Sequence, residues 1–183
     1  MSARESGVQV WVTDITYIRL PHNFCYLAAI LDAFSRRCIG RHLSRDIDTH
    51  LSKAALEKAI LLRQPPSGLI HHSDREVQYA SMLYTHCLEQ IGALVSMSGK
   101  GNPYDNAKAE SFFKTLKRKE LYLKDYRTYS EAEVNLGSFI DGVYNVKRLH
   151  SSLDYLTPVE VEATEANKQI DVSTVIPLEE PVR

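Results

Sequence analysis

The sequence has few of the features that would place the protein in a specialised class. Its three cysteines, Cys25, Cys38 and Cys87, lie far apart and form no CxxC pair. They therefore predict reduced core thiols rather than a disulfide framework or a zinc site. No apolar run approaches membrane-spanning length, and the N-terminus has no signal-peptide pattern. We see no internal repeat and no low-complexity tract, and we expect a soluble, cytoplasmic protein without a membrane partner.

The net charge is also small, −1 for 183 residues. A nearly neutral chain argues weakly against a nucleic-acid partner. Residues 160–183, however, hold two basic and six acidic side chains. Subtracting these from the totals of 22 and 23 leaves 20 basic and 17 acidic residues in 1–159, a net charge of +3. The basic residues gather at Lys114, Lys117, Arg118 and Lys119, and again at Lys147 and Arg148. Such a local basic surface can bind a phosphate backbone.

The hydrophobic pattern predicts one α/β domain with a mixed sheet covered by helices. Three β-rich runs joined by short connections, residues 8–18, 24–31 and 38–43, predict an antiparallel meander. Two further strands are expected at 69–72 and 93–97, and helices at about 49–63, 81–91, from about 104, and 130–144. The buried side of the first helix is expected to be Leu51, Ala54, Ala55, Ala59 and Leu62.

Three carboxylates fall where such a sheet places a ligand site, which is outside the ends of its strands. Asp14 lies within the first strand, Asp74 follows the fourth, and Glu110 lies on the helix expected to pack across them. On that helix Glu110, Lys114 and Lys117 share one arc beside the apolar stripe. Carboxylates suit magnesium, and two such ions can stabilise both oxygens of a displacement at phosphorus. A strand-end Asp making turn hydrogen bonds and a solvated helix face are the alternatives.

Five segments resemble, in order, the catalytic core of bacterial insertion-sequence transposases, the group related to retroviral integrases. These segments are WVTDITYI at 11–18, LDAFSRR at 31–37, IHHSDREVQYAS at 70–81, SMSGKGNPYDNAKAESFFKTLK at 96–117 and YNVKRLHSSLDYLTP at 144–158. The resemblance implies a ribonuclease H-like core at residues 8–161, with three antiparallel and then two parallel strands. We expect residues 1–7 to be a disordered lead-in and residues 162–183 a weakly ordered acidic tail.

The resemblance also implies a reaction and a set of site residues. The family's acidic triad corresponds to Asp14, Asp74 and Glu110, and its basic residue seven positions after the Glu corresponds to Lys117. The implied reaction is DNA strand cleavage and transfer of a 3′-hydroxyl, with two Mg²⁺ or Mn²⁺ ions when DNA is bound. Element ends and target DNA are the implied partners, with a homo-oligomer on the nucleoid. Residues expected to contact DNA are Lys114, Lys117, Arg118, Lys147, Arg148 and His150; a polar loop is the alternative for the last three.

Two departures from the family pattern keep other functions open. Glu76 stands where the family usually has Gly, and it could perturb the turn after Asp74. The family's N-terminal helix-turn-helix region is not recognised in this chain, and we expect it elsewhere or lost. A catalytically impaired remnant that only binds DNA non-specifically or oligomerises is therefore the main alternative, and a structure-selective nuclease is a third. The adjacent His71 and His72 favour structural roles over metal binding, since they point to opposite strand faces.

Overall fold

The computed structural model describes residues 9–74, 79–97 and 107–174, and its centre is a mixed sheet. The described strands are β1 (Val10–Arg19), β2 (Phe24–Asp32), β3 (Cys38–Ser44), β4 (Ile70–Ser73) and β5 (Leu94–Met97). Their order is β3-β2-β1-β4-β5; β1–β2 and β2–β3 are antiparallel, whereas β1–β4 and β4–β5 are parallel. The predicted mixed sheet with its antiparallel meander is confirmed.

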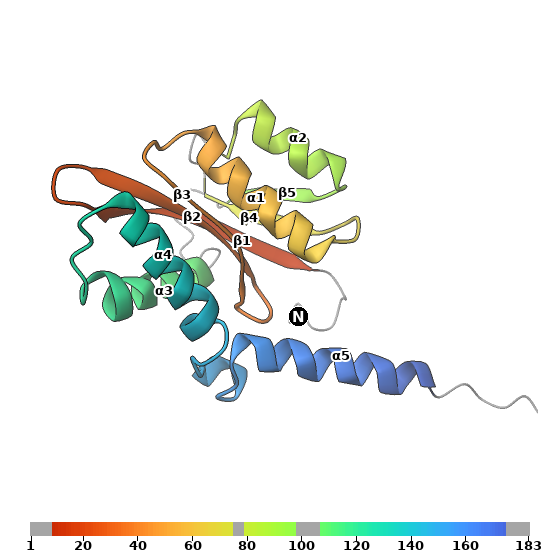
Figure 1. The fold of residues 1–183 in the computed structure, drawn as a ribbon. Coiled ribbons are helices and arrows are strands. Elements are labelled where there is room, and N and C mark those ends of the chain that lie inside the picture. The colour runs from red at the N-terminus through yellow and green to blue at the C-terminus, as the bar shows by residue number, and fades with distance from the viewer. Residues whose placement is uncertain (1–8, 75–78, 98–106, 175–183) are drawn as a thin grey trace, which may run out of the picture.

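Helices cover both faces of this sheet. The described helices are α1 (Thr49–Arg63), α2 (Met82–Gln90), α3 (Ala107–Leu116), α4 (Tyr129–Phe139) and α5 (Pro158–Thr174). Two π-helical turns, η1 (Lys117–Leu121) and η2 (Ile140–Tyr144), follow α3 and α4, and a 3₁₀ turn, η3 (Ser151–Leu153), precedes α5. Figure 1 shows α1 and α2 on one face of the sheet and α3 and α4 on the other. None of the described helices has the length and apolarity needed to cross a membrane.

The central strand β1 is fixed by a separate hydrophobic core on each face. Neighbouring residues of a strand point to opposite faces, and both faces of β1 are buried. Trp11 packs in one core with Leu51 and Tyr84, whereas Val12 packs in the other with Phe112 and Leu136. β1 is therefore held from both sides, which fixes the position of the residues that follow Val12.

Helix α1 begins and ends as its sequence predicts, but one residue of its expected buried side is exposed. Asp48 is the N-cap, and its side chain accepts a hydrogen bond from the Leu51 amide; Gln64 ends the helix with a positive φ. Leu62 is 54% exposed, so its predicted burial is wrong. The physical reason is its place in the last turn, where it borders an open groove beside β3; Leu56 is buried in the core instead.

The close approach of α1 to β3 depends on a glycine. A Cβ atom added at Gly40 would lie 2.3 Å from the carbonyl oxygen of Ala55 and 2.8 Å from the Cβ of Ala59. Both distances are shorter than real contacts of a Cβ atom, so the absent side chain sets how near the helix can pack. Ala55 and Ala59 are fully buried at this contact.

The C-terminal segment is helical as far as Thr174, where we expected weak order from residue 162. Helix α5 begins with a capping box, in which the Thr157 amide donates to Glu160 Oε2 (2.8 Å) and the Glu160 amide donates to Thr157 Oγ1 (3.3 Å). Val161 is buried one turn further on. These contacts explain the helix; residues 175–183, like 1–8, lie outside the described residues.

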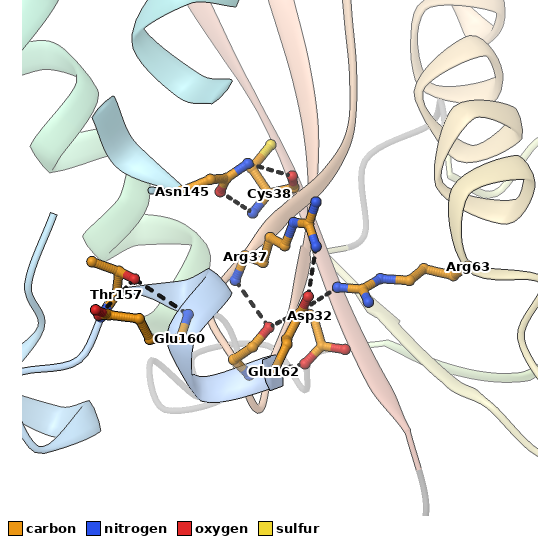
Figure 2. A network of polar contacts seen from close by, with 9 residues as sticks. Asp32, Arg37, Cys38, Arg63, Asn145, Thr157, Glu160 and Glu162 are labelled. Atoms are coloured by element: carbon orange, nitrogen blue, oxygen red, sulfur yellow. Dashed lines mark hydrogen bonds and ion pairs between the residues drawn. The ribbon is translucent and has the colours of Figure 1, made fainter. Parts of the chain in front are cut away.

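Glu162 joins α5 to two distant parts of the chain (Figure 2). Its carboxylate accepts hydrogen bonds from Ser35 Oγ (2.8 Å) and Arg37 Nη1 (2.6 Å), which lie in the β2–β3 connection. It also pairs with Arg63 at the end of α1. Burial alone raises the pKa of Glu162, but the hydrogen bonds from these three side chains outweigh it and hold the pKa below its ordinary value.

Candidate active site

The strand register brings two of the predicted carboxylates to neighbouring positions. β1 and β4 are parallel, with Val12 opposite His72. Two residues further along each strand stand Asp14, within β1, and Asp74, directly after β4. Because neighbouring strands lie about 4.8 Å apart, this register predicts that the two backbones pass close together. Both residues are half-buried.

A buried tyrosine lies near both of these carboxylates. Tyr79 is 1% exposed, and its phenol lies 3.3 Å from Thr13 Oγ1. Burial raises the pKa of the Tyr79 phenol well above its ordinary value, with a smaller contribution from Tyr84. The negative charges of Asp14 and Asp74 raise this pKa further. One phenol therefore responds to both carboxylates, which agrees with the strand register, and it stays neutral beside them.

Glu110 shares a groove with Asp14. The groove has a volume of about 480 Å³, and its lining includes Asp14, Glu110, Lys114, Lys117, Arg118 and Tyr122. We call it the carboxylate groove. Glu110 is exposed in the first turns of α3, and the Asp14 carboxylate accepts a hydrogen bond from the Ile15 amide at 2.8 Å. Asp74 is not among the described residues that line this groove.

Asp14 is thus a neighbour of Asp74 through the strand register and of Glu110 through the shared groove. Among residues 9–74, 79–97 and 107–174, no three His, Cys, Asp or Glu side chains are grouped so that they could hold one metal ion. The chemistry of the donors nevertheless fits a hard cation, because all three ligands would be carboxylate oxygens. Glu76 lies outside the described residues.

Three basic residues of α3 and η1 line the carboxylate groove, and two of them, Lys114 and Lys117, belong to the arc predicted beside Glu110. Lys114 and Arg118 are exposed and Lys117 is half-buried. The Lys117 ammonium lies over the ring of Tyr17, 5.6 Å from its centroid, an arrangement that attracts the cation to the ring face. Three cationic side chains therefore lie in the same groove as Asp14 and Glu110.

The three residues of the second predicted basic cluster differ in how exposed they are. Lys147 is exposed and Arg148 is half-buried, but His150 is only 7% exposed. Its ring packs edge-on against Tyr144 with centroids 5.3 Å apart. Burial, with the positive charges of Arg148 and Arg36, lowers the pKa of His150 to about 4. His150 is a neutral packing residue here, so we leave it out of the surface proposed below to contact DNA.

His71 and His72 have the structural environment that their positions suggested. The Tyr84 hydroxyl and His71 Nε2 are 2.9 Å apart in the core, and His72 Nδ1 lies 3.0 Å from Ser96 Oγ. Both rings are buried in β4. Burial, with a smaller contribution from His72, lowers the pKa of His71 to about 4. These contacts tie β4 to α2 and β5 and hold the strand that carries Asp74.

Comparison with models of known protein families identifies the family of this chain. Residues 5–103 match a model described as integrase core domain, and residues 92–158 match a second model of the same description. The chain belongs to the integrase core domain family. The resemblance to insertion-sequence transposases and retroviral integrases that the sequence indicated is thereby confirmed.

Known proteins similar to this integrase core include a transposase and two integrases. The transposase for insertion sequence element IS904 of Lactococcus lactis subsp. lactis (strain IL1403) is 42% identical over 154 residues, 84% of this chain and 61% of the relative. The chain spans about half to three-fifths of the length of the curated relatives it matches. The BIV integrase catalytic core domain superposes with a TM-score of 0.63 at 17% identity, covering 88% of this chain and 97% of that one.

The other integrase is the HTLV-2 integrase catalytic core domain in complex with magnesium, in its dimeric form. Its TM-score is 0.60 at 16% identity, covering 83% of this chain and 93% of that one. At these identities the likeness of the two solved structures concerns the fold. This integrase core has the ribonuclease H-like fold that its sequence predicted.

Sequence reasoning missed the aromatic residues around the site of this integrase core. Tyr79 lies five residues after Asp74, and nothing in its spacing distinguishes it from an ordinary core tyrosine. Tyr17 and Tyr122 line the surface next to Lys117, yet they belong to segments separated by about a hundred residues. Only the fold of the chain brings them together.

Proposed function

We propose that this integrase core is a DDE-type polynucleotidyl transferase that cleaves DNA strands and joins a DNA 3′-hydroxyl to a target phosphodiester during transposition. The observation that carries this proposal is the carboxylate groove, which combines Asp14 and Glu110 with Lys114, Lys117 and Arg118. Carboxylates that bind hard cations, placed beside cations that bind phosphate, suit displacement at a phosphodiester.

Asp14, Asp74 and Glu110 would hold the magnesium or manganese ions that this reaction uses. Two such ions, bound together with DNA, supply stabilisation of both the attacking and the leaving oxygens. The three carboxylates repel one another, and magnesium is usually held by one or two carboxylates together with substrate phosphates. Support for the metal comes from the donor set and from the HTLV-2 integrase core, which is described in complex with magnesium.

The chain's own residues bind and orient the DNA and the carboxylates. Lys114, Lys117 and Arg118 hold phosphates of the strand that enters the carboxylate groove. The Ile15 amide orients the Asp14 carboxylate through its hydrogen bond of 2.8 Å. The neutral phenol of Tyr79 packs in the core on the other face of β1 and supports that strand through its contact with Thr13. Lys147 is exposed, and we assign it as a further DNA contact, as the family resemblance implied.

The DNA partners are the ends of a mobile element and the target into which they are joined. Support comes from the relatives, which are named as transposases of insertion sequences. We infer that several copies of the chain act together, a view supported by the dimeric form of the HTLV-2 integrase core.

The proposal is tested by a joining assay with a labelled duplex that carries a free 3′-hydroxyl and a supercoiled plasmid as target. Strand transfer is expected with Mg²⁺ or Mn²⁺ and not with a chelator. Asp14→Asn and Glu110→Gln should each lower cleavage and transfer by at least about a hundredfold. Even mutation of residues that only contact a metal ligand lowers activity by up to about a hundredfold, and these two residues would be ligands themselves. Asp46→Asn is the matched control, because Asp46 is an exposed carboxylate in the loop before α1.

Two results would overturn the proposal. One is wild-type protein that is folded and binds the duplex but yields no metal-dependent product, which would favour the DNA-binding remnant. The other is Glu110→Gln with the activity of the wild type, which would remove the carboxylate groove from the reaction.

A further inference from the structure

A second groove runs on from the carboxylate groove along the far end of β1. Its volume is about 540 Å³, and it shares Lys117 and Tyr122 with the carboxylate groove. We call it the aromatic groove; its lining includes Tyr17, Arg19, Lys117, Tyr122, Lys124 and Asp125. Because the two grooves share two lining residues, a strand bound at Asp14 and Glu110 lies next to the aromatic groove.

The fold explains why this groove is open. β1 extends to Arg19, but its parallel neighbour β4 ends at Ser73. Extending the register of Val12 with His72 places Ser73 beside Thr13, so the later residues of β1 have no described strand on that side. The opposite wall comes from η1, a π-helical turn that carries Lys117 and leads into Tyr122. Such turns are frequent at functional sites.

Two aromatic rings of this groove face water. Tyr17 is 61% exposed and Tyr122 is 74% exposed. Tyr17 is held in place by Phe24, whose ring packs edge-on against it with centroids 5.7 Å apart. An exposed ring of fixed orientation beside a basic side chain is the arrangement on which unpaired bases stack in proteins that bind single strands. The hydroxyl of Tyr126, by contrast, is used within the protein, because it donates to Glu120 at 2.6 Å.

The charge of the groove suits the phosphates of the same strand. Arg19, Lys117 and Lys124 are basic, and Asp125 is the acidic member among the described lining residues. Lys124 is partly engaged, because its ammonium contacts Glu120 at 2.8 Å. Arg19 and Lys117 are therefore the main candidates for phosphate contacts.

We propose that the aromatic groove binds an unpaired nucleotide of the DNA strand whose neighbouring phosphate occupies the carboxylate groove. The base stacks on Tyr17 or Tyr122, and its phosphate contacts Lys117 or Arg19. Within a duplex a paired base presents its faces to its neighbours, whereas an unpaired nucleotide can turn a base face onto these rings. This inference rests on the proposed function, because it takes DNA as the substrate.

The test compares three labelled probes in binding titrations with the full chain. One is a single strand of thymidylates, the second is the same backbone with abasic sites, and the third is a blunt duplex. Tyr17→Leu removes the ring and keeps an apolar side chain, whereas Tyr17→Phe keeps the ring. Tyr155→Leu is the control, because Tyr155 is 69% exposed and does not line this groove.

Tyr17→Leu should weaken binding of the thymidylate strand by about fivefold to a hundredfold, the range given by stacking of one base. Binding of the abasic strand should weaken much less, because there Tyr17→Leu removes only the contact of the ring with Lys117, and Tyr17→Phe should bind like the wild type. If Tyr122 is the main stacking ring, Tyr122→Leu shows this pattern instead. The inference is overturned if both leucine variants match Tyr155→Leu, or if they weaken the abasic strand equally, because a protein partner or a general packing role would then be indicated.

A separate variant distinguishes this failure from failure of the proposed function. Lys114 lines the carboxylate groove and not the aromatic groove. Lys114→Ala should weaken the duplex, the thymidylate strand and the abasic strand alike. If it does so while Tyr17 and Tyr122 have no effect, only the aromatic groove loses its assignment. If the wild type binds none of the three probes, both the groove assignment and the proposed function are wrong.

Discussion

Lys117 lies at the junction of the two grooves, and its ammonium is positioned by a neighbouring ring. It is the one described residue besides Tyr122 that lines both grooves. Its contact with the Tyr17 ring restrains a side chain that would otherwise be mobile in water. A phosphate held there would therefore meet a cation that is already in place.

Replacing Lys117 by Ala should weaken DNA binding without unfolding the protein. One lost phosphate contact reduces the slope of the logarithm of the binding constant against the logarithm of salt concentration by about one. Titrations at several salt concentrations measure this slope. Lys119→Ala is the control, since Lys119 is an exposed lysine of η1 that lies outside the carboxylate groove. Equal slopes for the two variants would exclude the phosphate contact, and a large fall in melting temperature would show a structural role.

The buried histidines make stability depend on pH. Burial lowers the pKa of His71 to about 4 from 6.5. Between these values the unfolded chain binds a proton that the folded protein does not, so stability falls as the pH falls from about 6.5 towards 4. His71→Gln removes one such titrating group. The slope of the free energy of unfolding against pH should therefore become shallower, by up to about 1.4 kcal/mol per pH unit. His86→Gln, at an exposed position on α2, controls for the substitution.

Thermal unfolding followed by circular dichroism at a series of pH values measures this effect. The comparison concerns the slope, because His71→Gln also changes the contact with Tyr84 and can shift stability at every pH. A slope in His71→Gln that equals that of the wild type would show that His71 titrates alike in the folded and unfolded chains.

At the scale of elements, the packing of α1 on β3 depends on the absence of a side chain at Gly40. Gly40→Ala places a methyl group 2.3 Å from the Ala55 carbonyl oxygen, so the helix or the strand must move. Overpacking of this kind costs about 1–3 kcal/mol. Denaturant unfolding measures the loss. Gly142→Ala is the matched control, because nothing lies within 4 Å of its added Cβ; in η2 it should be neutral or slightly stabilising. Equal stability of both variants would contradict this account of the α1–β3 contact.

The elements differ in how far the sequence could predict them. The meander followed from connections too short for a crossover, and α1 followed from Asp48 and the proline-rich segment after it. Helix α5 was missed, although Thr157-Pro158-Val159-Glu160 is a capping box with proline at the first helical position.

The candidate site, like the elements, could be predicted from the sequence only in part. The order of strands and a helix crossing them were enough to predict Asp14 beside Asp74 and in one groove with Glu110, whereas convergence of all three carboxylates on one metal site stays a prediction. The aromatic groove could not be predicted, because it depends on where β4 stops relative to β1. That length is set by tertiary packing, and no periodicity in residues 69–72 encodes it. His150 was expected to contact DNA because of the family resemblance, whereas its ring is buried against Tyr144.

At the scale of the whole molecule, the described surface offers phosphate contacts and lacks an assigned element for reading base sequence. Phosphate contacts position a protein on DNA but carry little sequence information. The chain alone should therefore bind element ends and random DNA with similar affinity. Competition titrations with short duplexes test this. Preference for one duplex by about a thousandfold, as specific binders show, would contradict the prediction and place a recognition element within these residues.

The Glu162 contacts have a consequence for the order in which the molecule folds and unfolds. Glu162 and Arg37 are 125 residues apart, and Glu162 and Arg63 are 99 apart. Contacts between such distant residues require closure of a long loop, so we expect them to form after the sheet and α1. Glu162→Gln should then speed unfolding more than it slows refolding. Stopped-flow kinetics in denaturant measure both rates, with Glu57→Gln, which breaks a pair within one helix, for comparison.

During synthesis, a chain that has not yet reached Glu162 contains Arg37 and Arg63 without the carboxylate that pairs with both of them in the folded protein. Arg37 and Arg63 leave the ribosome about a hundred residues before Glu162, a delay of roughly 5–20 seconds at ordinary rates of elongation. Throughout this interval the surface on which α5 will pack is uncovered, and nucleic acid close to the ribosome can reach it. Attachment of α5 brings the Glu162 carboxylate to Arg37 and Arg63, so these two guanidinium groups are paired with an acid in the completed chain.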